Sequence, residues 1–127
     1  MTSFLLFASG GAMGACLRYS DGLAFTQHGG VSGAWATLCV NLLGSFILGA
    51  LMGWFAAREP DLESTLWLLV GVGMMGAFTT FSAFSRDTVE MFLSGDIAKG
   101  MIYAGFNLIG ALAAFAAGLL AFKRLLA

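Results

Sequence analysis

The residues best suited to chemistry gather in the segment GMMGAFTTFSAFSRD, residues 73–87. The segment lies in a long apolar stretch, yet it contains adjacent threonines, Thr79 and Thr80, and three phenylalanines at helical spacing. Backbone carbonyls released from a helix can coordinate cations, and aromatic ring edges with hydroxyl donors can face an anion. The residue types therefore indicate ion binding.

The apolar window around this segment runs from about Thr65 to Leu93, longer than one straight membrane span needs. Its glycine and threonine cluster divides it into halves of about a dozen residues, or ~18 Å of helix each. We expect helix hydrogen bonds to fail at Gly76, Thr79 and Thr80. The alternative is an ordinary helix with tightly packed glycines.

The phenylalanines Phe78, Phe81 and Phe84 lie three residues apart, so a continuous helix would place them on one face. Their positive ring edges could border an anion. At this spacing, a role in the core or against lipid is the more common one.

Two other apolar windows carry polar residues one helical turn apart. The first has Thr37, Asn41 and Ser45, and the second has Tyr103 and Asn107. An asparagine amide supplies two N–H donors and one carbonyl acceptor. These groups predict either donors along an ion path or hydrogen bonds between helices.

Composition places all of these residues in a membrane protein. The chain of 127 residues is 59% hydrophobic and 10% charged, with a mean hydropathy of +0.89. Soluble domains carry about 25% charged residues, and a span needs roughly 20 apolar residues. Four windows fit: residues 4–25, 34–56, 66–92 and 100–122. We predict an all-α fold, with residues 1–127 forming a single four-helix transmembrane domain.

Several features argue against other classes. The first residues have no basic region, so they do not indicate a cleavable signal peptide. Cys16 and Cys39 are expected to be small buried apolar residues, and His28 to lie in a loop without metal partners. The net charge is −1 with no basic cluster, so nucleic acid is not an expected partner.

Small residues recur at spacings of four and predict close helix packing in lipid. They are Gly10 with Gly14, Gly49 with Gly53, and the series Gly110, Ala114 and Gly118.

The basic residues give no clear membrane orientation. With four spans, one side holds Arg58, Lys123 and Arg124, and the other holds Arg18, Arg86 and Lys99. Orientation normally follows an excess of Lys and Arg on one side. The balance predicts insertion in both orientations and an antiparallel, dual-topology homodimer. The alternative is that unequal charge depth or another protein sets one orientation.

Four pieces of the chain together resemble the CrcB/Fluc family of fluoride channels. They are GGAMGACLRY, TLCVNLLGSFILG, GAFTTFSAF and the turn with Tyr103 and Asn107. The resemblance implies an antiparallel homodimer in the cell membrane, in a bacterium the inner membrane, with two narrow fluoride pathways at its interface. It also implies a third helix broken at mid-membrane and a structural Na⁺.

The resemblance also implies roles for individual residues. The carbonyls of Gly76 and Thr79 would hold the sodium ion. The expected fluoride pathway residues are Phe81 and Phe84 as ring edges, Asn41 as amide donor, Thr37, Ser82, Tyr103 and Asn107 as further donors, and Arg18 near an entrance. Arg18 could instead pair with Asp21. The sequence departs from the family pattern at Ala83, Asn107 and Ala111, which removes hydroxyl groups.

The function expected from this resemblance is passive export of cytoplasmic fluoride, without enzyme activity. A proton-coupled drug or cation antiporter would need a mid-membrane carboxylate, whereas Asp21 lies near the end of the first window and Glu90 late in the third. A noncatalytic assembly subunit would explain the glycines alone. A membrane enzyme lacks a recognisable nucleophile and base.

Overall fold

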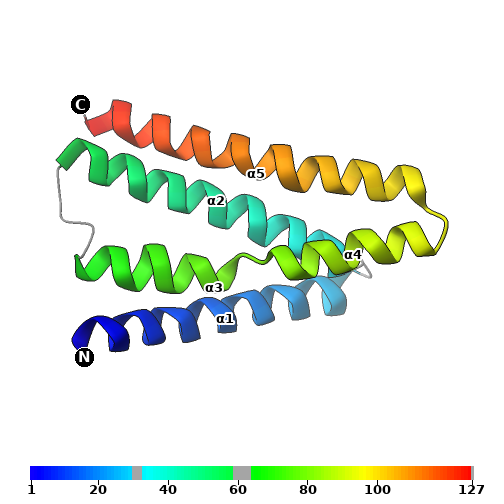
Figure 1. Ribbon diagram of the computed structural model, residues 1–127, viewed down its shortest axis with the longest axis horizontal. Coiled ribbons are helices and arrows are strands. Elements are labelled where there is room, and N and C mark those ends of the chain that lie inside the picture. Colours follow the sequence, from blue (N-terminus) through cyan, green and yellow to red (C-terminus); the bar gives the residue numbers. More distant parts are fainter. Residues whose placement is uncertain (30–32, 59–63, 127) are drawn as a thin grey trace.

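The chain is described by a computed structural model that places residues 1–29, 33–58 and 64–126. Its helices are α1 (Thr2–Gly29), α2 (Gly33–Arg58), the π-helix η1 (Trp67–Met75), α3 (Gly76–Phe78), α4 (Phe81–Leu93) and α5 (Ile97–Leu126). They run up and down as one elongated bundle, with both chain ends at the same end of it (Figure 1).

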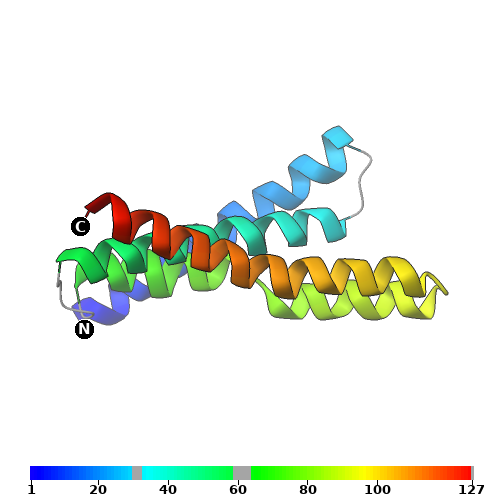
Figure 2. The same ribbon diagram turned by 90° about the horizontal axis from the view of Figure 1, so that it is seen from above.

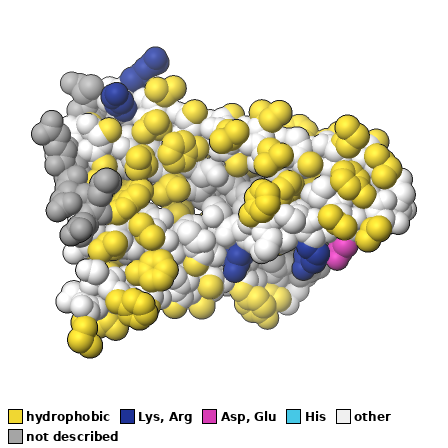
Figure 3. Space-filling model, in the orientation of Figure 1, with side chains coloured by type: hydrophobic (Ala, Val, Ile, Leu, Met, Phe, Trp, Pro, Cys, Tyr) yellow, Lys and Arg dark blue, Asp and Glu magenta, His cyan; other side chains and the backbone are white. Residues whose placement is uncertain are grey.

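Three of the described helical segments are long and apolar enough to cross a membrane: Gly33–Arg58, Trp67–Leu93 and Ile97–Leu125. The fourth expected span, residues 4–25, is helical, but it is less apolar than these three helices and is not among those apolar enough to cross a membrane. Glycines, serines and the charges of Arg18 and Asp21 lower its apolar character. Hydrophobic side chains are nevertheless spread over the whole length of the molecular face in Figure 3, where few charged side chains stand.

Glycines bring the helices into backbone contact, as their spacing predicted. A Cβ atom at Gly14 would overlap the Met74 carbonyl, and one at Gly10 would overlap that of Leu69. On the other side of the bundle, a Cβ at Gly49 would overlap the Phe115 carbonyl. Small residues therefore allow α1 to pack closely against η1, and α2 against α5. In lipid, this packing replaces the hydrophobic effect as the force that holds helices together.

The third span is interrupted where the two threonines stand. Thr79 has φ −78° and ψ 158°, and Thr80 has φ −152° and ψ 117°, so both are extended. The expected break is confirmed at these positions, whereas Gly76 keeps helical angles of −61° and −34°. The π-helical geometry before the break was not predicted. Within η1, the Trp67 ring packs over Gly71, so any side chain at position 71 would collide with the ring.

The second half of α1 diverges from the other helices, as Figure 2 shows from above. Helix α1 continues to Gly29, so the prediction that His28 lies in a loop is wrong. Cys16 and Cys39 are exposed rather than buried, because both face away from the helix packing. Composition alone does not separate the outer from the inner face of a uniformly apolar helix.

Candidate functional site

Asn41 of α2 holds the broken segment by two hydrogen bonds to one residue. Its Oδ1 accepts from the Thr80 backbone N–H at 2.8 Å, and its Nδ2 donates to the Thr80 carbonyl at 3.1 Å. This side chain replaces the helical partners that Thr80 lacks, as buried backbone groups require. Because the Thr80 N–H turns to Asn41, the Gly76 carbonyl loses the donor that a continuous helix would give it.

Thr80 also begins the next helix. Its Oγ1 accepts from the Ala83 N–H at 3.2 Å, which caps α4, and it lies 3.2 Å from the Ser82 hydroxyl. A threonine N-cap satisfies one of the free donors of a helix start. The backbone of Thr80 thus bonds to Asn41 at the break, and its side chain caps the start of α4.

Asn107 links the same site to α5. Its Oδ1 accepts from Asn41 Nδ2 at 3.0 Å, and its Nδ2 donates to the Tyr103 carbonyl at 3.2 Å. Only 4% of Asn107 is exposed. The hydrogen bond between the two asparagines confirms the expectation that polar residues connect the helices.

Asp87 is a buried residue of this site that the sequence analysis did not predict. It is 5% exposed, and its Oδ2 accepts from the Thr37 hydroxyl at 2.9 Å and the Tyr103 hydroxyl at 3.2 Å. Its Oδ1 accepts from Arg86 Nη2 at 2.7 Å and Nε at 3.1 Å. A carboxylate three residues after Phe84, inside an apolar window, was the signal that could have found it.

The phenylalanines do not share one face. Phe78 is buried with Val40 and Met75, whereas Phe81 and Phe84 meet edge to face with centroids 5.1 Å apart. The prediction fails for Phe78 because the break at Thr79 and Thr80 interrupts the helical repeat. Phe84 is buried and also lies 5.9 Å from the Tyr103 ring, but Phe81 is 70% exposed.

Two cavities flank the break. One of about 390 Å³ joins α2, α4 and α5. It is lined by Asn41, Ser45, Thr79, Thr80, Phe81, Phe84, Asn107, Leu108, Ala111, Leu112 and Phe115. The other, of about 490 Å³, contains Arg18, Thr37 and Arg86, and Thr80 lines both. The structure thus brings Asn41, Phe81, Phe84 and Asn107 together and places Arg18 and Thr37 on the opposite side.

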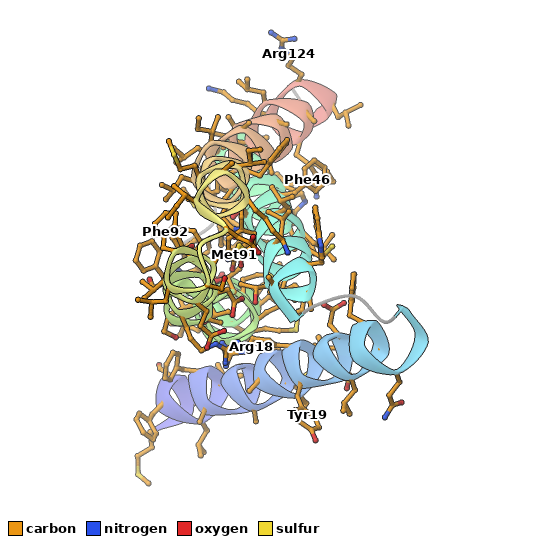
Figure 4. All side chains as sticks on the ribbon, turned by 90° about the vertical axis from the view of Figure 1, so that its right-hand side faces the viewer. Arg18, Tyr19, Phe46, Met91, Phe92 and Arg124 are labelled. Atoms are coloured by element: carbon orange, nitrogen blue, oxygen red, sulfur yellow. The ribbon has the colours of Figure 1, made fainter. Side chains whose placement is uncertain are left out.

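Arg18 points from α1 towards the interrupted segment, while the neighbouring Tyr19 points away from the bundle (Figure 4). Its Nη1 lies 3.5 Å from the Thr79 carbonyl. Within the described parts of the chain, no ion pair joins Arg18 to Asp21, so the alternative expectation of that pair is wrong. The two side chains leave α1 towards different cavities.

The cation ligands available at the break are neutral oxygens, from backbone carbonyls and from the side chains of Asn41, Thr79 and Thr80. Among the described residues, no group of three or more His, Cys, Asp or Glu residues could hold a metal ion. Gly76 is exposed, with open space beside its Cα, and Thr79 follows at the end of the same helical segment.

Long apolar helices around a buried row of polar side chains define a multi-pass membrane protein of the channel or transporter class. The profile of the family described as "CrcB-like protein, Camphor Resistance (CrcB)" matches residues 5–119. The chain belongs to this family.

Curated relatives match at full length. A protein of Hyphomonas neptunium named "Fluoride-specific ion channel FluC" is 39% identical over 127 residues, all of both chains. Proteins with the same name from Idiomarina loihiensis and Gloeobacter violaceus are 40% and 43% identical. Those alignments cover 94% and 95% of this chain, and 92% and 96% of the relatives.

Proposed function

We propose that this protein is a fluoride-specific ion channel of the cell membrane, in a bacterium the inner membrane. The observation that carries the proposal is the helix break beside a cavity with amide groups on one wall and paired phenylalanines on another. Relatives of the same length that are named fluoride channels support it. Neither the site nor the relatives favour an enzyme.

The fluoride pathway runs past Phe81, Phe84, Asn41 and Asn107. Within the described chain, the Asn107 amide donates to the Tyr103 carbonyl and also interacts with the Tyr103 hydroxyl, so it offers an N–H to an anion by releasing one of these partners. The ring edges of Phe81 and Phe84 add a weaker positive field. Several modest contacts allow an anion both to enter and to leave.

The hydrogen-bonded polar side chains continue from Asn107 to Tyr103, and from there to Asp87 and Thr37. Both hydroxyls donate to the Asp87 carboxylate in this structure. Each hydroxyl has a single proton, so it turns towards a passing anion only by leaving the carboxylate. Ser82 adds a further hydroxyl at the exposed start of α4, and Arg18 contributes positive charge to the cavity on the other side of the break.

The working channel is an antiparallel, dual-topology homodimer that shares a structural sodium ion. The residues present fit such an ion, because Gly76 has lost its helical donor and, among the described residues, the Thr79 carbonyl accepts only the 3.5 Å contact from Arg18, which a cation would displace. Two carbonyls from one chain are too few for a hard cation, so a second copy supplies the rest. Sodium would hold the two breaks together and add positive potential.

The arrangement of the chain ends and charges supports this assembly. Both termini lie at one end of the bundle, so three basic residues remain on each side of the membrane. With no excess of positive charge on either side, both orientations are open to the chain.

Anion efflux from liposomes that contain the purified protein tests the proposed function. We expect fluoride to leave without an imposed proton gradient, and chloride efflux to stay near that of empty vesicles. Asn41→Asp should reduce fluoride efflux by at least tenfold, because it puts a carboxylate beside the anion path. A strict need for a proton gradient would favour an antiporter, and no fluoride flux would reject the channel.

A further inference from the structure

Asp21 is an acidic side chain that the proposed channel does not use. It is the only Asp or Glu of α1, and its Oδ2 is buried without a hydrogen-bond donor from any described residue. Arg18, the nearest basic residue in sequence, turns to the Thr79 carbonyl instead. Ionisable groups in membrane helices are normally paired, so an unpaired carboxylate indicates a binding function.

The carboxylate borders a separate cavity of about 450 Å³, between the diverging half of α1 and the α2, η1 and α3 helices. The lining residues are Leu17, Ser20, Asp21, Ala24, Leu43, Ile47, Met74, Met75 and Phe78. The Ser20 hydroxyl is already bonded to the Cys16 carbonyl. The cavity therefore offers one negative charge within an otherwise apolar wall, at a volume that suits a small molecule.

We propose that this cavity binds a lipophilic cation, such as an ammonium or phosphonium ion with apolar substituents. A positive centre would pair with Asp21, and the substituents would contact the leucine, methionine and phenylalanine side chains. A bare metal ion does not fit, since hard cations need several oxygen ligands and Asp21 is the only carboxylate in the lining. A neutral apolar molecule would leave the buried Oδ2 atom of this half-buried side chain without a partner, which is costly.

Equilibrium dialysis of tetraphenylphosphonium against the purified full-length protein in detergent micelles tests this site, with protein-free micelles correcting for partition. Asp21→Asn should weaken binding at least about tenfold, as expected for removal of one partner of a buried charge pair. Asp96→Asn, which changes an exposed aspartate between α4 and α5, should bind as the parent does. Tetraphenylborate has the same shape with the opposite charge and should not bind.

A second variant separates the cavity from the charge. Ala24→Trp keeps Asp21 but fills the space, so it should also lose the phosphonium. Equal binding by the parent, Asp21→Asn and Ala24→Trp would overturn the proposal, as would binding of tetraphenylborate as tight as that of the phosphonium. Unchanged phosphonium binding with a loss of dimer in Asp21→Asn, measured by size-exclusion chromatography, would assign the cavity to a contact between copies and also overturn it.

Discussion

The two halves of the interrupted helix are held in different ways. The first half, η1 and α3, lies against α1 through backbone contacts, with Gly73 close to the Phe7 carbonyl and Gly14 close to that of Met74. The second half, α4, is amphipathic and is attached by side-chain hydrogen bonds from Asp87 to α2 and α5. The packing of the first half thus depends on glycines, which have no side chain, whereas the position of the second half depends on the Asp87 side chain.

The difference explains how a break can persist in an apolar bundle. Backbone contacts with α1 fix the position of the first half, and main-chain atoms in such close contact cannot move to relieve a collision. The second half then needs only Asn41 to satisfy Thr80 and Asp87 to set the rotation of α4. The polar site lies where these two modes of attachment meet.

Filling the glycine contact should have the largest effect on stability. In Gly14→Leu, the new side chain would collide with the Met74 backbone, which cannot move without displacing η1, and we expect a loss of about 3 kcal/mol. Unfolding by sodium dodecyl sulfate in mixed micelles measures it. Gly11→Leu is the matched control, because a Cβ there meets nothing within 4 Å. Equal losses in the two variants would contradict the role of close backbone contact.

Removing the carboxylate that attaches α4 should have the next largest effect. Asp87→Ala leaves the Tyr103 hydroxyl without its acceptor, whereas the Thr37 hydroxyl keeps the Gly33 carbonyl at 3.2 Å. We expect a loss of about 2 kcal/mol in the same unfolding measurement. Glu90→Ala is the control on the same helix. The Glu90 side chain is 68% exposed and lies 3.8 Å from Arg86, so its removal should cost less than about 0.5 kcal/mol. A larger loss from Glu90→Ala would show that exposed charges attach this helix.

The N-cap of α4 should have the smallest effect of the three. Thr80→Val removes the hydroxyl that accepts from the Ala83 N–H, and we expect a loss of about 1 kcal/mol and faster hydrogen exchange at Ala83. Thr80→Ser keeps the hydroxyl and should restore slow exchange. If the serine variant exchanged as fast as the valine variant, the cap would not be what holds the start of α4.

The sequence predicted the features that local chemistry decides. Two threonines amid glycines within one apolar window indicated the break, and Asn41, Tyr103 and Asn107 were recognised by the cost of polar groups in lipid. Glycine spacing likewise predicted close packing, which the contacts of Gly14 and Gly49 confirm.

The features that the sequence did not predict depend on helix rotation. The break shifts the register between Phe78 and Phe81, so residues three apart face different surroundings. Asp87 follows Arg86 directly in the sequence, and only the packing shows that Asp87 is buried while Arg86 is exposed. Arg18 and Asp21 have the spacing of an ion pair, yet the path of α1 sends them to different cavities.

Fluoride efflux from liposomes with two phenylalanine variants of α4 tests the central claim most directly. Phe81 meets Phe84 at the cavity beside the break, whereas Phe92 lies near the far end of the same helix and does not line that cavity. We predict that Phe81→Ile lowers the fluoride efflux rate at least tenfold and that Phe92→Ile keeps the parent rate, since Phe81, unlike Phe92, borders the anion path with its ring. Equal rates for Phe81→Ile and the parent would contradict an anion path beside the interrupted helix.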